Sequence, residues 1–202
     1  MGQPNTPHES HASHHPHTPH NHHHHVTSLC NTFPKDVIDA AQATTKKWGV
    51  PASVTLAQWA LESACGSKLP VGSNNPFGIK VRKGQKGVMT TTHEDKKGKH
   101  VKTTAEFRQY TSLKEAFDDH GRLLATGTGF TKARLVNDKP EKYAEALTHT
   151  YATDPHYGSK LKSIMKKNNL TQYDAIELKA GEAEAAQVKD GPTEIKTPIT
   201  LP

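Results

Sequence analysis

The chain has 202 residues, a formal net charge of +6 and an apolar fraction of 33%. This length suits one domain of ordinary size plus tails, and the low apolar fraction predicts that part of the chain does not fold. The sequence lacks a run of about 18 apolar residues and a basic, apolar leader at its N-terminus. We therefore expect a soluble protein with no membrane span and no visible Sec signal.

Residues 1–32 differ in composition from the rest of the chain. They consist mostly of His, Pro, Ser, Thr and Asn, and ten of the fifteen histidines precede Val26. Such a segment cannot bury enough apolar surface to offset the entropy of ordering, so we predict a disordered tail. The run His22–His25 could bind a transition metal or be part of a purification tag. Because it lacks the ligand spacing of a structural site, we predict no metal centre.

A first amphipathic helix is predicted between Thr32 and Gly49. Pro34 suits its first turn and Gly49 its end. One face carries apolar side chains at helical spacing, namely Phe33, Val37, Ile38 and Ala41. This pattern is typical of a packing helix without chemistry of its own.

A second, more apolar helix is predicted from Val50 to Gly66. Pro51 suits its first turn, Gly66 suits its end, and apolar residues recur at Val54, Ala57, Ala60, Leu61 and Ala64. We expect this helix to be buried.

Glu62 lies near the C-terminal end of this predicted helix, among apolar neighbours. Partial burial disfavours the ionised form of a carboxyl, and the negative end of the helix dipole disfavours it again. Glu62 is therefore a candidate proton donor. The alternative is a glutamate that faces solvent on the polar side of the helix.

A β-hairpin is predicted within residues 79–110. The segments Val88–Thr92 and Val101–Phe107 alternate in polarity, and the polar run Asp95–Lys99 between them is typical of a turn. Glu94 then falls at the tip of the first strand.

Helices return after the hairpin. Ser112 and Glu115 form a capping-box pattern at the start of one helix, and further amphipathic helices are predicted over 140–149 and 157–168. The loop between these two begins with Tyr151, an aromatic residue suited to stacking on a sugar ring. Periodicity fades over 175–202, which we interpret as a flexible tail or linker.

Four motifs occur in a fixed order along this chain: ALES at 60–63, NNPFGIK at 74–80, FRQYTSLKEAFDDH at 107–120 and YATDP at 151–155. Together they resemble the glucosaminidase domain of glycoside hydrolase family 73, over about residues 33–174. The resemblance implies a mainly helical, lysozyme-like α+β domain with a small β-hairpin lobe. It also implies a peptidoglycan hydrolase that cleaves the glycan bond between N-acetylglucosamine and N-acetylmuramic acid, with bacteriolytic activity.

The resemblance implies roles for particular residues. Glu62 would be the general acid, and Glu94 would be a second carboxylate that activates water or stabilises oxocarbenium charge, with Asp95 and Glu106 as alternatives. Retaining and inverting mechanisms differ in the distance between the two carboxyl groups, which depends on how far the hairpin closes. A substrate-assisted route through the N-acetyl group is a further alternative. This acid–base chemistry requires no metal or organic cofactor.

Three further residues are candidates for substrate binding. Tyr151 would stack on substrate, and Asn75 and Phe77 would shape the floor of a groove. The alternative for each is a packing role, with Tyr151 in the core and the other two residues holding their loop under the helix.

The two cysteines are Cys30 and Cys65, and we expect two free thiols. A bridge between them, which would tie the tail across the active-site helix, is the alternative. Cys65 as a nucleophile is disfavoured, because no His with Asn or Asp accompanies it. ALESACG also departs here from the ALESGWG of many family members, so the motif does not identify the residue that forms the pocket wall beside Glu62.

Residues 33–174 hold 23 Lys and Arg against 14 Asp and Glu, a net charge of +9. A basic surface concentrates anionic polymers, but the chain has no nucleic-acid motif. We predict a monomer that acts on peptidoglycan strands in the periplasm or cell wall, with an immunity protein as partner if it is a toxin. The alternatives are a muramidase or lytic transglycosylase on the same fold, and a wall-binding module without activity.

Overall fold

The structure is a computed structural model that describes residues 30–96 and 99–175, with side chains at all of these positions except 92–96, 99 and 100. The predicted tails lie outside this range almost entirely, and so does the run His22–His25. The elements in chain order are α1 (Lys35–Trp48), α2 (Ala52–Ser63), β1 (Gly87–Lys96), β2 (Lys99–Arg108), α3 (Leu113–Thr126), η1 (Thr128–Phe130), α4 (Thr131–Arg134), α5 (Pro140–Ala146), α6 (Tyr157–Lys167) and η2 (Leu170–Asp174).

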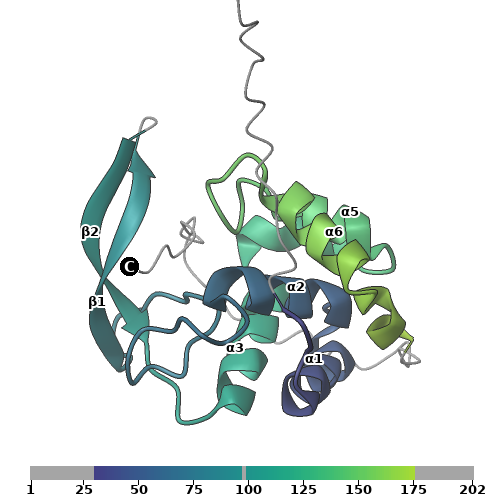
Figure 1. The fold of residues 1–202 in the computed structure, drawn as a ribbon, viewed down its shortest axis with the longest axis horizontal. Coiled ribbons are helices and arrows are strands. Elements are labelled where there is room, and N and C mark those ends of the chain that lie inside the picture. Colours follow the sequence, from purple (N-terminus) through teal and green to yellow (C-terminus); the bar gives the residue numbers. More distant parts are fainter. Residues whose placement is uncertain (1–29, 97–98, 176–202) are drawn as a thin grey trace, which may run out of the picture.

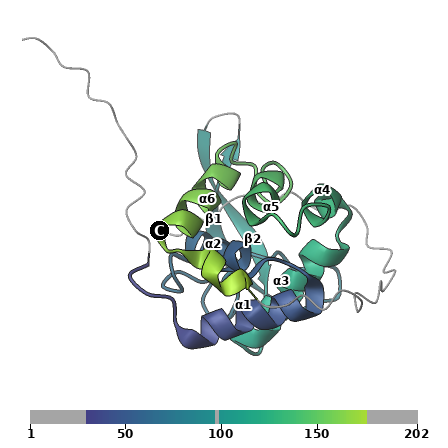
Figure 2. The same ribbon diagram turned by 90° about the vertical axis from the view of Figure 1, so that its right-hand side faces the viewer.

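Helix α2 lies at the centre of the helical body (Figure 1). It contacts α1, α5, α6 and the 3-10 turn η2, and Leu61 is its only residue that is not buried. The predicted buried helix is therefore confirmed, although it ends at Ser63 rather than at Gly66. Figure 2 shows α1, α3 and α6 around it from a second direction.

Two helix ends follow from local sequence. Gly49 closes α1 in the left-handed conformation, with φ 71°, and its N–H donates to the Thr45 carbonyl. At the start of α3, the Ser112 hydroxyl accepts a hydrogen bond from the Glu115 N–H, and the Glu115 carboxylate accepts from the Thr111 N–H. The predicted capping box thus forms, with its return bond one residue earlier than the motif requires.

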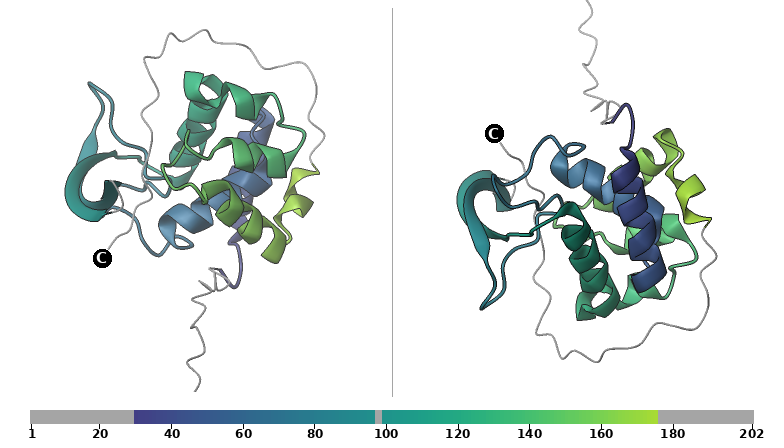
Figure 3. Two further views of the ribbon diagram at one scale, coloured as in Figure 1. Left: turned by 90° about the horizontal axis from the view of Figure 1, so that it is seen from above. Right: turned by 90° about the horizontal axis from the view of Figure 1, so that it is seen from below.

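The predicted hairpin is also confirmed, and it stands to one side of the helices (Figure 3). Its strands β1 and β2 pair antiparallel without a bulge, from Gly87 opposite Arg108 to Lys96 opposite Lys99. Its base is tied to the NNPFGIK loop, because the Arg108 N–H donates to the Ile79 carbonyl and the Val81 N–H donates to the Glu106 carbonyl.

The two faces of the hairpin differ in exposure. Val88 and Thr90 of β1, with Thr103, Ala105 and Phe107 of β2, share one face and are buried or half-buried. On the opposite face Met89, Lys102, Thr104 and Glu106 are exposed and Thr91 is half-buried, and toward the tip Val101 of the first face is exposed as well. The alternation of side chains along a strand therefore gives the hairpin an inner and an outer face.

Within the described residues, the helices are too short or too polar to cross a membrane. The short elements η1 and α4 were not predicted from the sequence. Their Phe130 and Ala133 belong to the same buried cluster as α2, so they extend the core rather than add a second one.

Candidate active site

Glu62 is the penultimate residue of α2 and is only 5% exposed. The last turn of α2 carries no basic residue, so no cation on that turn balances the carboxylate. The carboxyl-terminal end of the helix dipole is negative and disfavours a second negative charge. A carboxylate in this position depends on groups from other elements to satisfy it.

Tyr157, the first residue of α6, supplies one such group. Its hydroxyl donates a hydrogen bond to Glu62 Oε1 at 2.7 Å, and its oxygen accepts one from Gln58 Nε2 at 3.0 Å. Gln58 lies one turn before Glu62 on α2, and both Gln58 and Tyr157 are fully buried. The carboxylate is thus held by a side chain from a helix nearly a hundred residues away in sequence.

The Tyr157 hydroxyl keeps its proton. Burial raises the pKa of Tyr157 well above its usual value, and the negative charge of Glu62 raises it further. The same two causes, in the same order, raise the pKa of Tyr151. Tyr157 is consequently a neutral hydroxyl, and therefore a hydrogen-bond donor, throughout the physiological pH range.

An aromatic cluster lies beside this pair and joins the motifs. The rings of Phe77 and His120 stack with centroids 4.0 Å apart, and those of Tyr151 and Tyr157 stack at 5.7 Å. The Tyr151 hydroxyl donates to the Phe77 carbonyl at 2.9 Å. The NNPFGIK loop, α3 and the YATDP loop therefore meet in one packed unit next to Glu62.

The expectation that Tyr151 offers an exposed ring for sugar stacking is wrong for this structure. Tyr151 is 0% exposed, and its ring lies between Tyr157, His120 and Phe130. Thr153 and Pro155 of the YATDP loop are exposed, but Tyr151 and Ala152 are buried, and the Tyr151 hydroxyl has a buried acceptor in the Phe77 carbonyl. Tyr151 has the core role that was the alternative.

Asn75 and Phe77 also have packing roles here. Asn75 is 1% exposed, and its amide nitrogen donates to the Ile79 and Arg108 carbonyls while its amide oxygen accepts from the Ile79 N–H. Phe77 is 0% exposed. The two residues fix the loop to the base of the hairpin, as the packing alternative stated.

An ionic cluster at the hairpin base was not assigned from the sequence, although Arg108, Tyr110 and Asp119 fall within the third motif and Arg122 follows it by two residues. The Asp119 carboxylate accepts from the Tyr110 hydroxyl at 2.7 Å and pairs with Arg108 at 2.7 Å and with Arg122 at 2.9 Å. Burial opposes the charge of Asp119, but Tyr110 and the two guanidinium groups outweigh it and lower its pKa. This cluster fastens the end of β2 to α3.

Glu94 lies on β1 near the tip of the hairpin, opposite Val101. Its side chain is outside the described part of the structure. Because the register has no bulge, position 94 has the parity of Val88 and Thr90 and so belongs to the inner face. Asp95 and Glu106, the alternatives, have the parity of the outer face.

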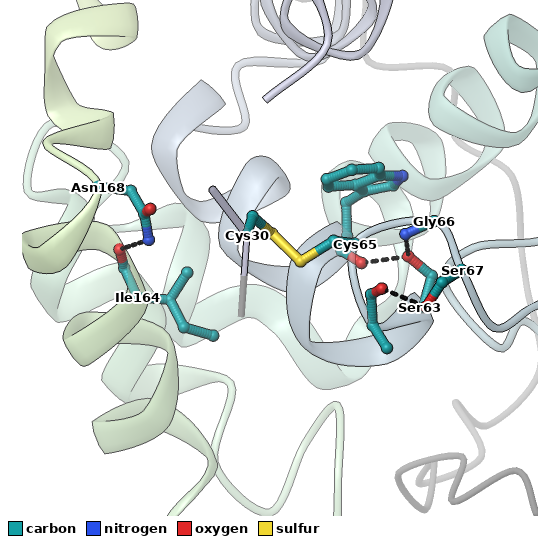
Figure 4. Close-up of a disulfide and its surroundings, with 9 residues drawn as sticks. Cys30, Ser63, Cys65, Gly66, Ser67, Ile164 and Asn168 are labelled. Carbon is teal, nitrogen blue, oxygen red and sulfur yellow. Dashed lines mark hydrogen bonds between the residues drawn. A yellow bond between two sulfur atoms is a disulfide. The ribbon is translucent and has the colours of Figure 1, made fainter. Parts of the chain in front are cut away.

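The expectation of two free thiols is wrong. Cys30 and Cys65 form a disulfide with Cα atoms 5.7 Å apart, and Figure 4 shows the bridge between the segment before α1 and the turn after α2, with Ile164 of α6 nearby. A sulfur held in a disulfide is no thiolate, so Cys65 is not a nucleophile. Sequence separation alone gave no sign that the two cysteines meet.

The bridge stabilises an unusual turn. After Ser63 the backbone of Ala64, Cys65 and Gly66 has positive φ throughout, and the Gly66 N–H donates to the Ser63 hydroxyl at 2.8 Å. The segment that carries Cys30 also brings Phe33 against Trp59, with ring centroids 5.6 Å apart. Both contacts lie in the C-terminal half of α2 or directly after it, near the end that carries Glu62.

Among the residues with described placement, no three His, Cys, Asp or Glu side chains are grouped so that they could hold a metal ion. Glu62 itself is a buried carboxyl with a hydroxyl donor at Oε1.

Comparison with known families identifies the family of this chain. The model of the glucosaminidase family, described as mannosyl-glycoprotein endo-beta-N-acetylglucosaminidase, matches residues 38–170. This chain belongs to the glucosaminidase family. The matched range runs from the first turn of α1 to the first residue of η2. It contains Glu62, Glu94 and Tyr157 but neither Cys30 nor Phe33.

Curated relatives of this glucosaminidase-family domain are named as a glucosaminidase, a peptidoglycan hydrolase and an N-acetylmuramidase. Exo-glucosaminidase LytG of Bacillus subtilis is 38% identical over 142 residues, which are 67% of this chain and 50% of LytG. Peptidoglycan hydrolase FlgJ of Escherichia coli is 37% identical over 63% of this chain and 43% of its own. A probable N-acetylmuramidase of Lactococcus lactis is 34% identical over 73% and 36%. The chain thus spans half or less of these relatives.

Solved structures confirm the lysozyme-like α+β fold. The catalytic domain of the autolysin Auto from Listeria monocytogenes superposes with a TM-score of 0.64 at 32% identity, covering 73% of this chain and 89% of that one. The glycoside hydrolase domain of Salmonella typhimurium FlgJ gives a TM-score of 0.52 at 33% identity, covering 68% and 89%.

The disulfide leads to a first prediction. Protein purified under oxidising conditions and then denatured should show no thiol that reacts with iodoacetamide until a reductant is added. Replacing both cysteines by serine should lower the free energy of unfolding by about 2–4 kcal/mol, because the bridge closes a loop of intermediate length.

Urea denaturation with and without reductant measures this difference. The control is the double-serine variant itself, whose stability should not respond to the reductant. Two reactive thiols in the oxidised, denatured protein would contradict the bridge.

Proposed function

We propose that this domain is an endo-β-N-acetylglucosaminidase that hydrolyses the bond between N-acetylglucosamine and N-acetylmuramic acid in peptidoglycan. The observation that carries the proposal is the buried Glu62 carboxyl, held by Tyr157 at the end of α2 in a chain of the glucosaminidase family. A carboxyl in a water-poor setting is suited to give a proton to a leaving glycosidic oxygen.

Glu62 would act as the general acid. Burial and the end of the helix dipole favour its protonated form, whereas the Tyr157 hydroxyl favours the ionised form that remains once the proton has left. The site would thus tolerate both states of the carboxyl, which is what a group that donates and regains a proton requires.

Glu94 would be the second carboxylate. Its parity on β1 supports this role, because it shares the inner face of the hairpin with the half-buried Val88 and Thr90. Carboxyl groups about 5–5.5 Å apart would favour a covalent intermediate, and those about 6.5–9.5 Å apart would leave room for an attacking water. The parity of the three positions along the strands favours Glu94 over Asp95 and Glu106.

The place of action would be the periplasm or the cell wall. The Cys30–Cys65 disulfide supports a location outside the reducing cytoplasm. The basic charge of residues 33–174 would favour an anionic wall over a neutral polymer. If the chain is a toxin, an immunity protein would be its partner.

Cleavage of the alternate linkage is the second candidate function, and the name of the Lactococcus relative favours it. A muramidase or lytic transglycosylase would need only Glu62 and would leave a different sugar at the new chain end. A wall-binding module without activity would release no fragments.

The Glu62 role leads to a second prediction. Glu62→Gln should lower the rate of glycan cleavage about 10²–10⁴-fold, because the amide cannot donate the required proton. Digested sacculi, reduced with borohydride and analysed by mass spectrometry, should show N-acetylglucosaminitol at the new ends with the wild type. Reduced N-acetylmuramic acid at those ends would identify a muramidase, and full activity of Glu62→Gln would remove Glu62 from the reaction.

The hairpin leads to a third prediction. Glu94→Gln should lower the rate at least about tenfold, since it removes the inner-face carboxylate that would assist the attack on the sugar. Glu106→Gln, on the outer face of the same hairpin, is the matched control and should retain the wild-type rate. Equal rates for the two variants would assign the second role to another group.

A further inference from the structure

A continuous chain of hydrogen bonds runs behind Glu62 through three helices. His120 Nε2 of α3 pairs with Gln58 Oε1 at 3.0 Å, Gln58 Nε2 donates to the Tyr157 oxygen at 3.0 Å, and the Tyr157 hydroxyl donates to Glu62 Oε1 at 2.7 Å. His120, Gln58 and Tyr157 are all 0% exposed. Solvent therefore does not supply alternative partners to these side chains.

These hydrogen bonds run in one direction, which the chemistry of the side chains dictates. An amide oxygen only accepts and an amide nitrogen only donates, so the observed Gln58 orientation requires a proton on His120 Nε2. Gln58 then donates to Tyr157, which leaves the single Tyr157 proton for Glu62. With the amide reversed, the Gln58 oxygen would accept the hydrogen bond from the Tyr157 hydroxyl. The phenol oxygen could then contact Glu62 only as an acceptor.

Packing holds the first member of the chain in place. The His120 ring is stacked on Phe77 with an interplanar angle of 17° and meets the Tyr151 ring edge-on at 5.9 Å. A ring confined on two sides keeps its Nε2 aimed at Gln58. The aromatic cluster thereby fixes the direction of hydrogen bonds that end at the carboxyl.

We propose that Gln58 and His120 are positioning residues that act through Tyr157, directing its hydroxyl to Glu62 Oε1 so that Oε2 delivers the catalytic proton. This inference rests on the proposed role of Glu62 as the acid. It gives a task to the polar atoms of two fully buried side chains.

Two titratable neighbours of this carboxyl are tyrosines. The charge of Glu62 raises the pKa of both Tyr157 and Tyr151, after burial. Asp119 and Tyr110 lie farther off, in the ionic cluster that also influences Tyr151. His120 is separated from Glu62 by Gln58 and Tyr157.

The experiment measures kcat and KM against pH on soluble, uncross-linked glycan strands. Tyr157→Phe removes the donor to ionised Glu62, so the alkaline limb of kcat should move up by about one pH unit or more, since hydrogen bonds to charged groups are the stronger ones. Gln58→Met and His120→Phe keep the size of each side chain and should move this limb in the same direction by less. For both, kcat should fall about tenfold and KM should stay within about twofold, as expected when only transition-state stabilisation is lost.

Two comparisons separate positioning from a general loss of structure. Tyr143→Phe removes another buried hydroxyl, one that has no hydrogen-bond partner among the described residues, and should leave the pH profile unchanged. The double variant Gln58→Met with Tyr157→Phe should be no worse than Tyr157→Phe alone, because Gln58 acts only through Tyr157. Additive losses, or an unshifted profile in Gln58→Met, would overturn the proposal.

A measurement on the unmodified protein covers the case in which variants fail to fold. Nitrogen-15 NMR of the histidine rings should show His120 with a proton on Nε2. A proton on Nδ1 alone would overturn the proposed direction of the chain. If the wild type cleaves no glycan, the proposed function fails, and this NMR result still decides the hydrogen-bond direction.

Discussion

The hydrogen bond between Tyr157 and Glu62 joins the two parts of the sequence on which the site depends. Glu62 belongs to the most deeply buried helix of the fold, where an unsatisfied carboxylate would cost several kcal/mol. Hydrogen bonds to charged groups contribute about 1.5–3 kcal/mol each. The start of α6, the Gln58 turn of α2 and the His120 turn of α3 can therefore be understood as the surroundings that make this buried carboxyl tolerable.

The hairpin side of the proposed site is held by a different set of contacts. The base of the hairpin is rigid, because the Asn75 amide, the backbone bonds to Ile79 and Val81, and the Arg108–Asp119–Arg122 cluster all fix the end of β2. Glu94 lies far along β1 from this anchor. If Glu62 and Glu94 act as proposed, a firmly held acid would be combined with a second carboxylate far along a two-stranded hairpin, which would suit a site that must admit a polymer.

Much of this arrangement could be predicted from the sequence. Apolar spacing predicted α2 and its burial, alternation predicted the hairpin, and Glu62 stood out because it interrupts an apolar helix. The tyrosine of the YATDP loop was misjudged, since the sequence identifies a loop but not the Phe77 carbonyl that draws Tyr151 inward. The disulfide was missed for a similar reason, because only the fold brings residue 30 to the turn after α2. Hydrogen-bond direction through Gln58 and His120 depends on three helices meeting, which no local pattern encodes.

The central claim is that the glycan lies between the end of α2 and the inner face of the hairpin, with Glu62 at the bond to be cleaved. A crystal structure of Glu62→Gln with a peptidoglycan tetrasaccharide tests it most directly. The account predicts the amide of residue 62 within hydrogen-bonding distance of the glycosidic oxygen that follows N-acetylglucosamine, and the Glu94 carboxylate close to the anomeric carbon of that sugar. A saccharide bound away from α2, or one whose glycosidic oxygens are all out of reach of residue 62, would contradict it.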